Sequence, residues 1–96
     1  MKKHEWPFSQ PRNCAVISLR EIVFEGKPIL YLTHDKDDEG WQFLTREPVS
    51  KEDAVVVTLE EIVQLDPSIL KLADLPPGWM ATRQTASAAW ERSERA

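Results

Sequence analysis

The apolar positions of the chain fall into short runs that have the periods of strands or of helices. Runs at residues 14–17, 29–34, 41–45, 54–57 and 79–83 are rich in β-branched and aromatic residues, which is typical of short strands. Residues 18–24 and 58–63 instead place apolar side chains three and four positions apart, which is typical of short helices. The sequence therefore predicts an α+β fold, with a small antiparallel sheet of about four or five strands and two short helices packed on one face.

A polar connection between two of these strands lies at the centre of the pattern. Pro28 starts the first strand, where a proline removes no interior ladder bond, and Asp35–Gly40 separates it from the strand that begins at Trp41. Two apolar runs joined by a polar loop that ends in glycine predict an antiparallel hairpin. Residues 54–57 are apolar at every position, which predicts a strand that is buried on both faces.

Helix starts are indicated by residues that cap the first turn. Ser18 with Glu21, and Thr58 with Glu61, both have the form of a capping box. Asp66-Pro67 predicts a further helical start, because aspartate is a favoured N-cap and the missing proline N–H costs nothing at the first helical position.

The length of 96 residues predicts a single domain spanning 1–96, with an irregular N-terminal arm at 1–12 and a frayed tail at 91–96. The predicted core consists of Val16, Ile17, Ile29, Tyr31, Phe43, Val56, Leu59, Ile62, Val63, Ile69 and Leu72. Of the four tryptophans, Trp41 and Trp79 are expected in the core, whereas Trp6 and Trp90 are open between core and interface.

The net charge of −4 is distributed unevenly along the chain. Residues 34–66 carry ten acidic and three basic side chains, whereas the segments before and after them are slightly basic. A field of that sign disfavours nucleic acid and favours a basic protein partner. There is no apolar run of the roughly 20 residues that span a bilayer, no apolar signal-peptide core and only one cysteine, so we expect a cytoplasmic protein without membrane contact.

The acidic connection is also the best-looking candidate for a metal site. Asp35, Asp37 and Glu39 stand at the first, third and fifth positions before Gly40, as at the start of a calcium loop. The twelfth position is Arg46, where a calcium loop requires a bidentate glutamate, and the flanks are predicted strands rather than helices. We therefore expect a solvated hairpin turn with no metal or other cofactor, and keep a metal-responsive module as an alternative.

A nucleophilic site is the second chemical alternative. Cys14 and His34 could form a thiolate–imidazole pair with an aspartate as orienter. Cys14 stands in an apolar run, where cysteines are usually inert packing residues, and His34 is expected at the surface of a strand end. One cysteine and two distant histidines do not provide a zinc site.

Several short motifs form a series that covers roughly residues 13–91. They are Cys14-Ala15-Val16, Gly40-Trp41-Gln42-Phe43, the segment 55–62, Asp66-Pro67-Ser68-Ile69 and the segment 77–83. This series resembles a family of small bacterial domains of unknown function, which is similar to a group assigned as immunity proteins of polymorphic toxin systems. The resemblance implies a protein-binding role and brings no established catalytic residues.

Together these observations predict a non-enzymatic protein-binding module, with an immunity-type neutraliser of a bacterial toxin as one form of it. The residues expected to contact a basic partner are Asp35, Asp37, Asp38, Glu39 and Trp41. The alternatives are a small cysteine-dependent enzyme that uses Cys14 and His34, and the metal-responsive acidic loop. The sequence names neither the partner nor the oligomeric state.

Overall fold

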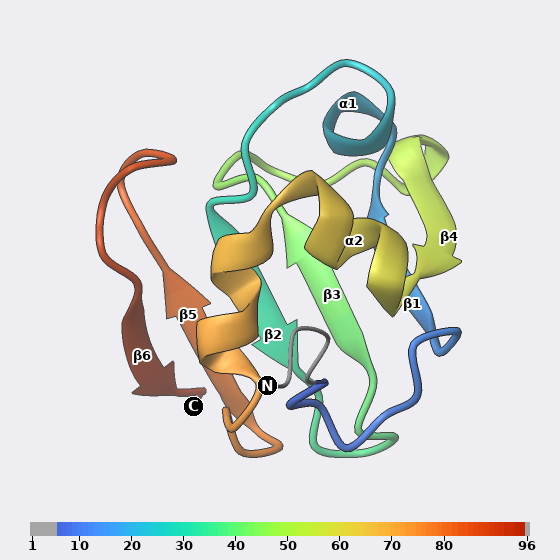
Figure 1. Cartoon of the computed structure of the whole chain (residues 1–96). Coiled ribbons are helices and arrows are strands. Elements are labelled where there is room, and N and C mark those ends of the chain that lie inside the picture. Colours follow the sequence, from blue (N-terminus) through green and yellow to red (C-terminus); the bar gives the residue numbers. More distant parts are fainter. Residues whose placement is uncertain (1–5, 96) are drawn as a thin grey trace, which may run out of the picture.

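A six-stranded sheet forms the centre of the computed structural model, which describes residues 6–95 (Figure 1). Its strands are β1 (Ala15–Leu19), β2 (Tyr31–His34), β3 (Trp41–Leu44), β4 (Ala54–Thr58), β5 (Trp79–Thr82) and β6 (Glu91–Glu94). The α-helices are α1 (Arg20–Val23) and α2 (Leu59–Leu65), and the 3₁₀ helices are η1 (Lys51–Asp53) and η2 (Pro67–Leu72).

The strand order in the sheet is β4-β1-β3-β2-β5-β6. All neighbouring pairs are antiparallel except β1 and β3, which run parallel with Ile17 opposite Gln42. The α+β class and the hairpin of β2 with β3 are confirmed. The sheet is larger than predicted, with six strands instead of four or five, and it is mixed rather than antiparallel throughout, because the β2–β3 hairpin inserts β3 beside β1.

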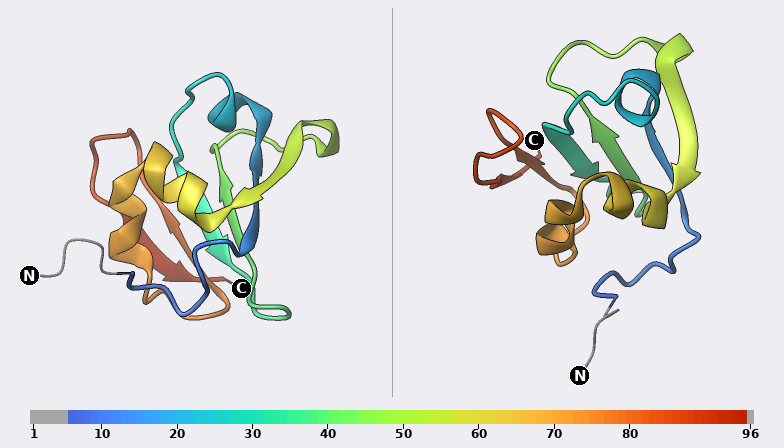
Figure 2. Two further views of the ribbon diagram at one scale, coloured as in Figure 1. Left: turned by 45° about the vertical axis from the view of Figure 1, so that its right-hand side comes forward. Right: turned by 45° about the horizontal axis from the view of Figure 1, so that its top comes forward.

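The helices are divided between one face and one end of the sheet. Helices α2 and η2 follow each other across one face, in front of the central strands, whereas the single turn of α1 lies beyond the end of β1 (Figures 1 and 2). Buried side chains from α2 and η2, among them Ile62 and Ile69, belong to the same core cluster as Phe43 of β3. The core therefore lies between the sheet and these two helices.

Most of the predicted core is confirmed. The fully buried members of the prediction are Val16, Ile29, Phe43, Leu59, Ile62, Ile69 and Leu72. Tyr31 and Val63 are partly buried and pack against this cluster. Ile17 and Val56 were predicted wrongly, because their side chains are 40% and 71% exposed.

The error at Val56 comes from its place on the face of the sheet that α2 and η2 do not cover, together with the edge position of β4. The run 54–57 was predicted to be buried on both faces, but β4 is an edge strand and pairs only with β1 among the described strands. Val56 lies opposite Ile17, on the face that alternates with buried Val16. An uninterrupted apolar run therefore does not by itself require two covered faces.

Two of the three capping predictions are confirmed and one is wrong. Thr58 and Glu61 form the predicted capping box at the start of α2, with Glu61 N–H donating to Thr58 Oγ1 at 3.1 Å and Thr58 N–H donating to Glu61 Oε1 at 2.9 Å. Asp66 caps η2, with Pro67 at the first position. The predicted box at Ser18 is wrong, because Ser18 lies inside β1 and its hydroxyl donates to the carbonyl of Phe43 at 2.9 Å.

The two ends of the described chain both lie against the body. Residues 6–12 contain no helix or strand, but Phe8 is buried and Trp6 packs on the core cluster. The tail was predicted to fray from residue 91, whereas Glu91–Glu94 form β6 and pair in register with β5. The hydrogen bonds to β5 compensate for a sequence that has little strand propensity of its own.

Candidate functional site at the acidic turn

The connection between β2 and β3 is a tight turn with a defined backbone. Asp35 N–H donates to the carbonyl of Gly40 at 2.7 Å, which closes the turn. Glu39 has the left-handed backbone conformation, with φ of 58°. Gly40 N–H donates to Asp38 Oδ1 at 2.9 Å, and a Cβ at Gly40 would lie only 3.1 Å from that oxygen. A side chain at position 40 would therefore require the Asp38 carboxylate to shift by a few tenths of an ångström.

Asp35 fixes the turn to the rest of the sheet. Its carboxylate accepts hydrogen bonds from Thr33 Oγ1 at 3.2 Å and from Gln42 Nε2 at 2.9 Å. Arg95 Nη1 also reaches Asp35 Oδ1 at 2.9 Å and forms an ion pair between the end of β6 and the turn. Asp35 is therefore a partly buried structural carboxylate, and its negative charge is paired with the positive charge of Arg95.

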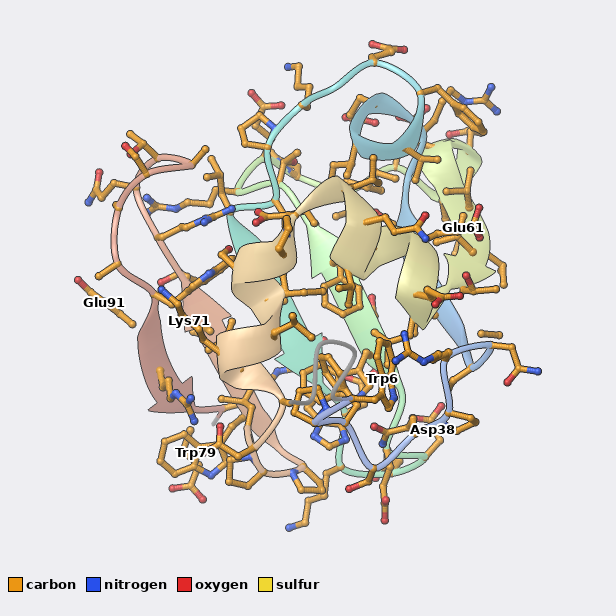
Figure 3. All side chains as sticks on the ribbon, in the orientation of Figure 1. Trp6, Asp38, Glu61, Lys71, Trp79 and Glu91 are labelled. Atoms are coloured by element: carbon orange, nitrogen blue, oxygen red, sulfur yellow. The ribbon has the colours of Figure 1, made fainter. Side chains whose placement is uncertain are left out.

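The other carboxylates of the turn point to solvent. Asp37, Asp38 and Glu39 are exposed, and Figure 3 shows Asp38 at the end of the molecule where this turn lies. Beside the turn is a pocket of about 460 Å³, lined by Asp35, Lys36, Asp37, Asp38, Pro77, Gly78, Glu94 and Arg95. Four carboxylates and two cations line this pocket, so its charge is negative on balance.

Trp41 does not belong to this exposed surface. The residue was expected both in the core and as an aromatic contact for a partner, and its side chain is only 2% exposed. The indole stacks on the ring of His34 at 4.1 Å between centroids and meets Phe8 edge-on at 5.3 Å. The expectation of a core residue is confirmed, and the expectation of a partner contact is corrected, because a side chain this deeply buried has no surface to offer a partner.

His34 is also buried, against the prediction of a surface position. Its Nδ1 lies 2.7 Å from the carbonyl of Leu75, which can only accept, so Nδ1 carries the proton. Cys14 is partly buried, and its Sγ contacts the carbonyl of Ala15 at 3.6 Å. Within residues 6–95 no hydrogen bond joins Cys14 to His34, so the predicted nucleophile and base are not brought together as a pair.

The arrangement of the acidic side chains also bears on the alternative of a metal-responsive loop. In the described part of the chain, no group of three or more histidine, cysteine, aspartate or glutamate side chains is arranged to hold a metal ion. The first position of the calcium-like pattern, Asp35, already accepts from two side-chain amide or hydroxyl groups and an arginine. The turn is therefore organised by protein donors.

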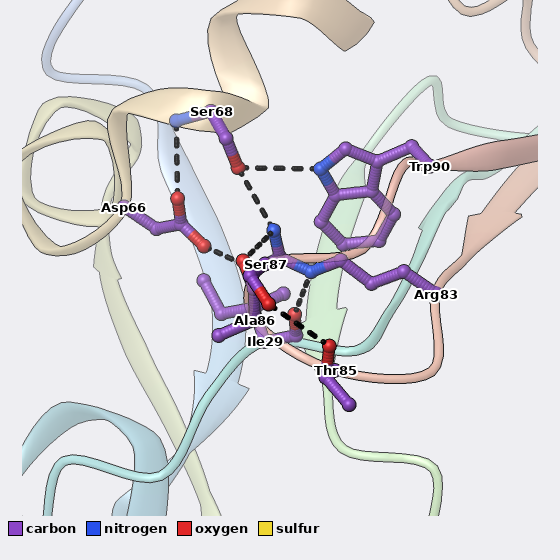
Figure 4. A network of polar contacts seen from close by, with 8 residues as sticks. All are labelled: Ile29, Asp66, Ser68, Arg83, Thr85, Ala86, Ser87 and Trp90. Carbon is purple, nitrogen blue, oxygen red and sulfur yellow. Dashed lines mark hydrogen bonds and ion pairs between the residues drawn. The ribbon is translucent and has the colours of Figure 1, made fainter.

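A second polar cluster, centred on Arg83, was not predicted from the sequence (Figure 4). Arg83 follows β5 and is 4% exposed. Its Nε donates to the carbonyl of Ile29 at 2.9 Å, and its Nη1 donates to Ser68 Oγ at 3.1 Å and to the carbonyl of Ala86 at 3.0 Å. Its Nη2 makes a short contact with the carboxylate of Asp66. The guanidinium thus joins β5 and the loop after it to η2 and to the segment before β2.

The environment of Asp66 favours its ionised form. Partial burial raises its pKa, but the hydrogen bonds from Ser68 and Arg83 and the charge of Arg83 outweigh that effect, so the pKa of Asp66 is lowered. Trp90 closes the cluster, because Arg83 lies 4.2 Å from its ring centroid and Trp90 Nε1 donates to Ser68 Oγ at 3.2 Å. Trp90 is partly buried and holds the 84–90 loop against η2.

A signal for this cluster was present in the sequence. Alternation along 79–83 places Trp79, Ala81 and Arg83 on one face, and Ala81 is fully buried. A buried arginine requires a carboxylate, and Asp66 was already predicted as an N-cap. The function of the cluster is structural, since its donors and acceptors are occupied by one another.

A scan against protein-family models and searches of curated proteins and of solved structures find no match for this chain. No helix among residues 6–95 is long and apolar enough to cross a membrane.

Proposed function

We propose that the chain is a non-enzymatic protein-binding module that takes a basic protein partner through the acidic turn. The observation that carries the proposal is the combination of a fixed turn with exposed charge. Asp35 is held by Thr33, Gln42 and Arg95, whereas the exposed Asp37 and Asp38 line the pocket together with Glu94. A surface that is already ordered loses little conformational entropy when it binds.

The chemistry of the pocket indicates the kind of group that it would take. Asp37, Asp38 and Glu94 make no ion pair with the described residues, and apart from Asp38 Oδ1, which accepts from Gly40 N–H, no hydrogen bond to the described residues occupies their carboxylate oxygens. Lysine and arginine side chains of a partner match this surface, and arginine can bind a carboxylate through two parallel hydrogen bonds. The resemblance to immunity-type domains supports a toxin as the partner, and the acidity of residues 34–66 supports a basic one.

Affinity capture from the lysate of the source cell, followed by quantitative binding, tests this function. The captured protein is purified and its affinity is measured for the wild-type chain and for the variant with Asp37→Asn, Asp38→Asn and Glu39→Gln. We expect the triple variant to bind at least about tenfold more weakly, because three charges are lost from one surface. Unchanged affinity for every captured partner would contradict the proposal.

A control with the same change in net charge separates local from global electrostatics. Glu25, Glu47 and Glu91 are exposed and lie toward the opposite end of the sheet from the acidic turn: Glu25 follows α1, Glu47 follows β3, and Glu91 begins β6 opposite Thr82. Their replacement by glutamine removes three charges away from the turn, so we expect affinity close to that of the wild type. An equal loss in both variants would assign the effect to net charge instead of to the acidic turn.

A further inference from the structure

The two edges of the sheet differ in how they are protected against pairing with another strand. The edge strand β6 carries Glu91, Arg92 and Glu94, and charged side chains at an edge discourage the addition of a further strand. The opposite edge strand, β4, reads Ala-Val-Val-Val-Thr and carries neither charge nor proline. No described strand lies on its outer side. Its composition is that of a strand that can accept a neighbour.

The hydrogen-bond pattern shows which backbone groups of β4 point outward. Leu59 N–H donates to the carbonyl of Cys14 at 2.9 Å, just beyond the strand, which fixes the alternation of the antiparallel ladder with β1. The amides of Val55 and Val57 then face β1, and those of residues 54, 56 and 58 face outward.

Two of the three outward amides are already occupied. Ala54 N–H donates to the carbonyl of Lys51, and Thr58 N–H donates to Glu61 Oε1 at 2.9 Å. Among the outward amides of the strand, Val56 N–H is therefore the one that an added strand can use, together with the outward carbonyls. The edge thus presents one donor, at its centre, and this donor sets the register of an incoming strand.

The side chains beside this donor are apolar and exposed. Val56 is 71% exposed and lies opposite Ile17, which is 40% exposed. Both are on the face of the sheet that is not covered by α2, because buried Val16 is on the other. A strand added to β4 with an apolar side chain opposite Val56 would remove this pair from water.

The charges at the two ends of β4 indicate what kind of strand fits. Glu52 and Asp53 precede the strand, and Glu60 and Glu61 follow it (Figure 3 shows Glu61 beside β4). Three cations lie near them: Lys51; Arg20, which follows Leu19 opposite Ala54; and Arg12, which pairs with Glu60 at 3.0 Å. Carboxylates outnumber cations at this edge, so a segment with basic residues at both ends is complementary to it.

A second copy of the chain fits less well. A symmetric antiparallel pair centred on Val56 would bring the acidic segment before β4 of one copy, with Glu52 and Asp53, beside the acidic segment after β4 of the other, with Glu60 and Glu61, and surfaces of like charge repel each other. The charge pattern therefore favours a different protein.

We propose that β4 binds an extended segment of a partner as an added antiparallel strand, with an apolar centre opposite Val56 and basic residues on both sides. The proposal rests on the proposed function, since it assumes a basic protein partner, and it adds the mode of recognition. Backbone bonds at Val56 set the register, the Val56–Ile17 pair takes the apolar side chain, and the flanking carboxylates take the cations.

A synthetic peptide tests this mode without knowledge of the natural partner. The probe is a nonapeptide of alternating threonine and valine with two lysines at each end, and the control peptide has glutamates in place of the lysines. Amide hydrogen exchange and chemical shifts are followed by NMR on the full chain. We expect the lysine peptide to slow exchange at Val56 and to leave Val57 unchanged, because the Val57 amide is already bonded to β1. The glutamate peptide is expected to bind at least about tenfold more weakly.

Matched variants locate the effect on the edge. Val56→Lys places a positive charge on the free edge and is expected to weaken binding of the lysine peptide by about tenfold or more. Val49→Lys makes the same change at another exposed valine, 51% exposed and outside the strand, and is expected to bind as the wild type does. Should Val56→Lys fail to fold, as judged by its NMR spectrum, the proposal is still tested by the exchange of the Val56 amide in the wild-type chain and by the glutamate peptide.

Three results would overturn the proposal. The first is an unaltered Val56 amide at saturating peptide, the second is equal binding of both peptides, and the third is protection of Val56 that rises with protein concentration without peptide, which indicates a second copy. The variant with Asp37→Asn, Asp38→Asn and Glu39→Gln leaves β4 intact, and we expect it to bind the peptide nearly as the wild type does. Peptide shifts confined to residues 35–39 would overturn the β4 inference and leave the acidic turn as the binding site.

Discussion

The guanidinium of Arg83 lies 4.2 Å from the ring centroid of Trp90, and both side chains bind the hydroxyl of Ser68. This relationship brings the loop after β5 onto η2, in a chain that otherwise has little regular structure between β5 and β6. Because Arg83 is almost fully buried, its charge is tolerated only with the acceptors that surround it. The cluster is therefore a sensitive point of the fold.

Replacement of Arg83 by methionine should lower the free energy of unfolding by about 3 kcal/mol, since the carbonyls of Ile29 and Ala86 and the carboxylate of Asp66 lose their donor. Urea denaturation measures the change. Arg83→Lys should be destabilised almost as much, because a lysine ammonium cannot reproduce the planar fork of donors of the guanidinium. Arg92→Met is the control, as its ion pair with Asp74 is exposed, and it should change stability little. Equal stability of Arg83→Met and the wild type would contradict the assignment.

The lowered pKa of Asp66 gives the same cluster a pH dependence. A carboxylate whose folded pKa lies below its unfolded value of about 4 contributes stability above that value and loses it as the pH falls toward the folded pKa. We expect the wild type to lose stability below about pH 4 more steeply than Asp66→Asn, in which this titration is absent. Urea unfolding at pH 7, 4 and 3 provides the comparison, and identical slopes would show that Asp66 is not linked to folding.

The difference between the two faces of the sheet predicts a contrast between two apolar truncations. Ile62 of α2 is fully buried, so Ile62→Ala should cost about 2–5 kcal/mol of unfolding free energy through lost transfer and a cavity. Val56→Ala removes an exposed side chain and should cost less than about 0.5 kcal/mol. Chemical denaturation of both variants tests the contrast, and a small cost at Ile62 would mean that α2 does not pack as described.

The capping box at the start of α2 is the best-defined local signal in the sequence, and its contribution can be measured. Thr58→Ala removes the acceptor of the Glu61 amide and should destabilise the chain by about 1 kcal/mol. Thr58→Ser keeps the hydroxyl and should recover most of that stability. Similar losses in both variants would show that the methyl group, not the cap, is what matters at this position.

Local patterns predicted the elements that local physics determines. The capping box at Thr58, the N-cap at Asp66 and the hairpin around Asp35–Gly40 depend on residues a few positions apart, and each is confirmed. The edge position of β4 could not be read in this way, because it depends on which strands become neighbours. Three consecutive valines are compatible with burial on both faces and with an edge strand alike.

The same limit applied to the candidate site. The acidic turn was identified from its composition, but the composition did not show which of its carboxylates is structural and which are exposed. Asp35 became structural through Arg95, which is 60 positions away, whereas Asp37 and Asp38 have no such partner among the described residues. The tail that provides Arg95 was expected to fray, because 91–94 has little strand propensity, and the register with β5 is the non-local contact that orders it.

The fixed acidic turn makes a kinetic prediction for a basic partner. Exposed carboxylates act over about a Debye length, roughly 10 Å at 0.1 M salt, so Asp37, Asp38 and Glu39 should attract the partner before contact is made. The association rate should therefore fall by about tenfold or more between roughly 0.05 and 0.5 M salt, while dissociation changes much less.

Stopped-flow or surface-based kinetics with the captured partner measures both rates. In the variant with Asp37→Asn, Asp38→Asn and Glu39→Gln, association should be slower at low salt and depend less on salt, and the thermal stability should be close to that of the wild type because these side chains are exposed. The Glu25, Glu47 and Glu91 control should keep the salt dependence of the wild type. If the triple variant associates at the wild-type rate at low salt, the acidic turn does not steer the partner and the binding surface lies elsewhere on the molecule.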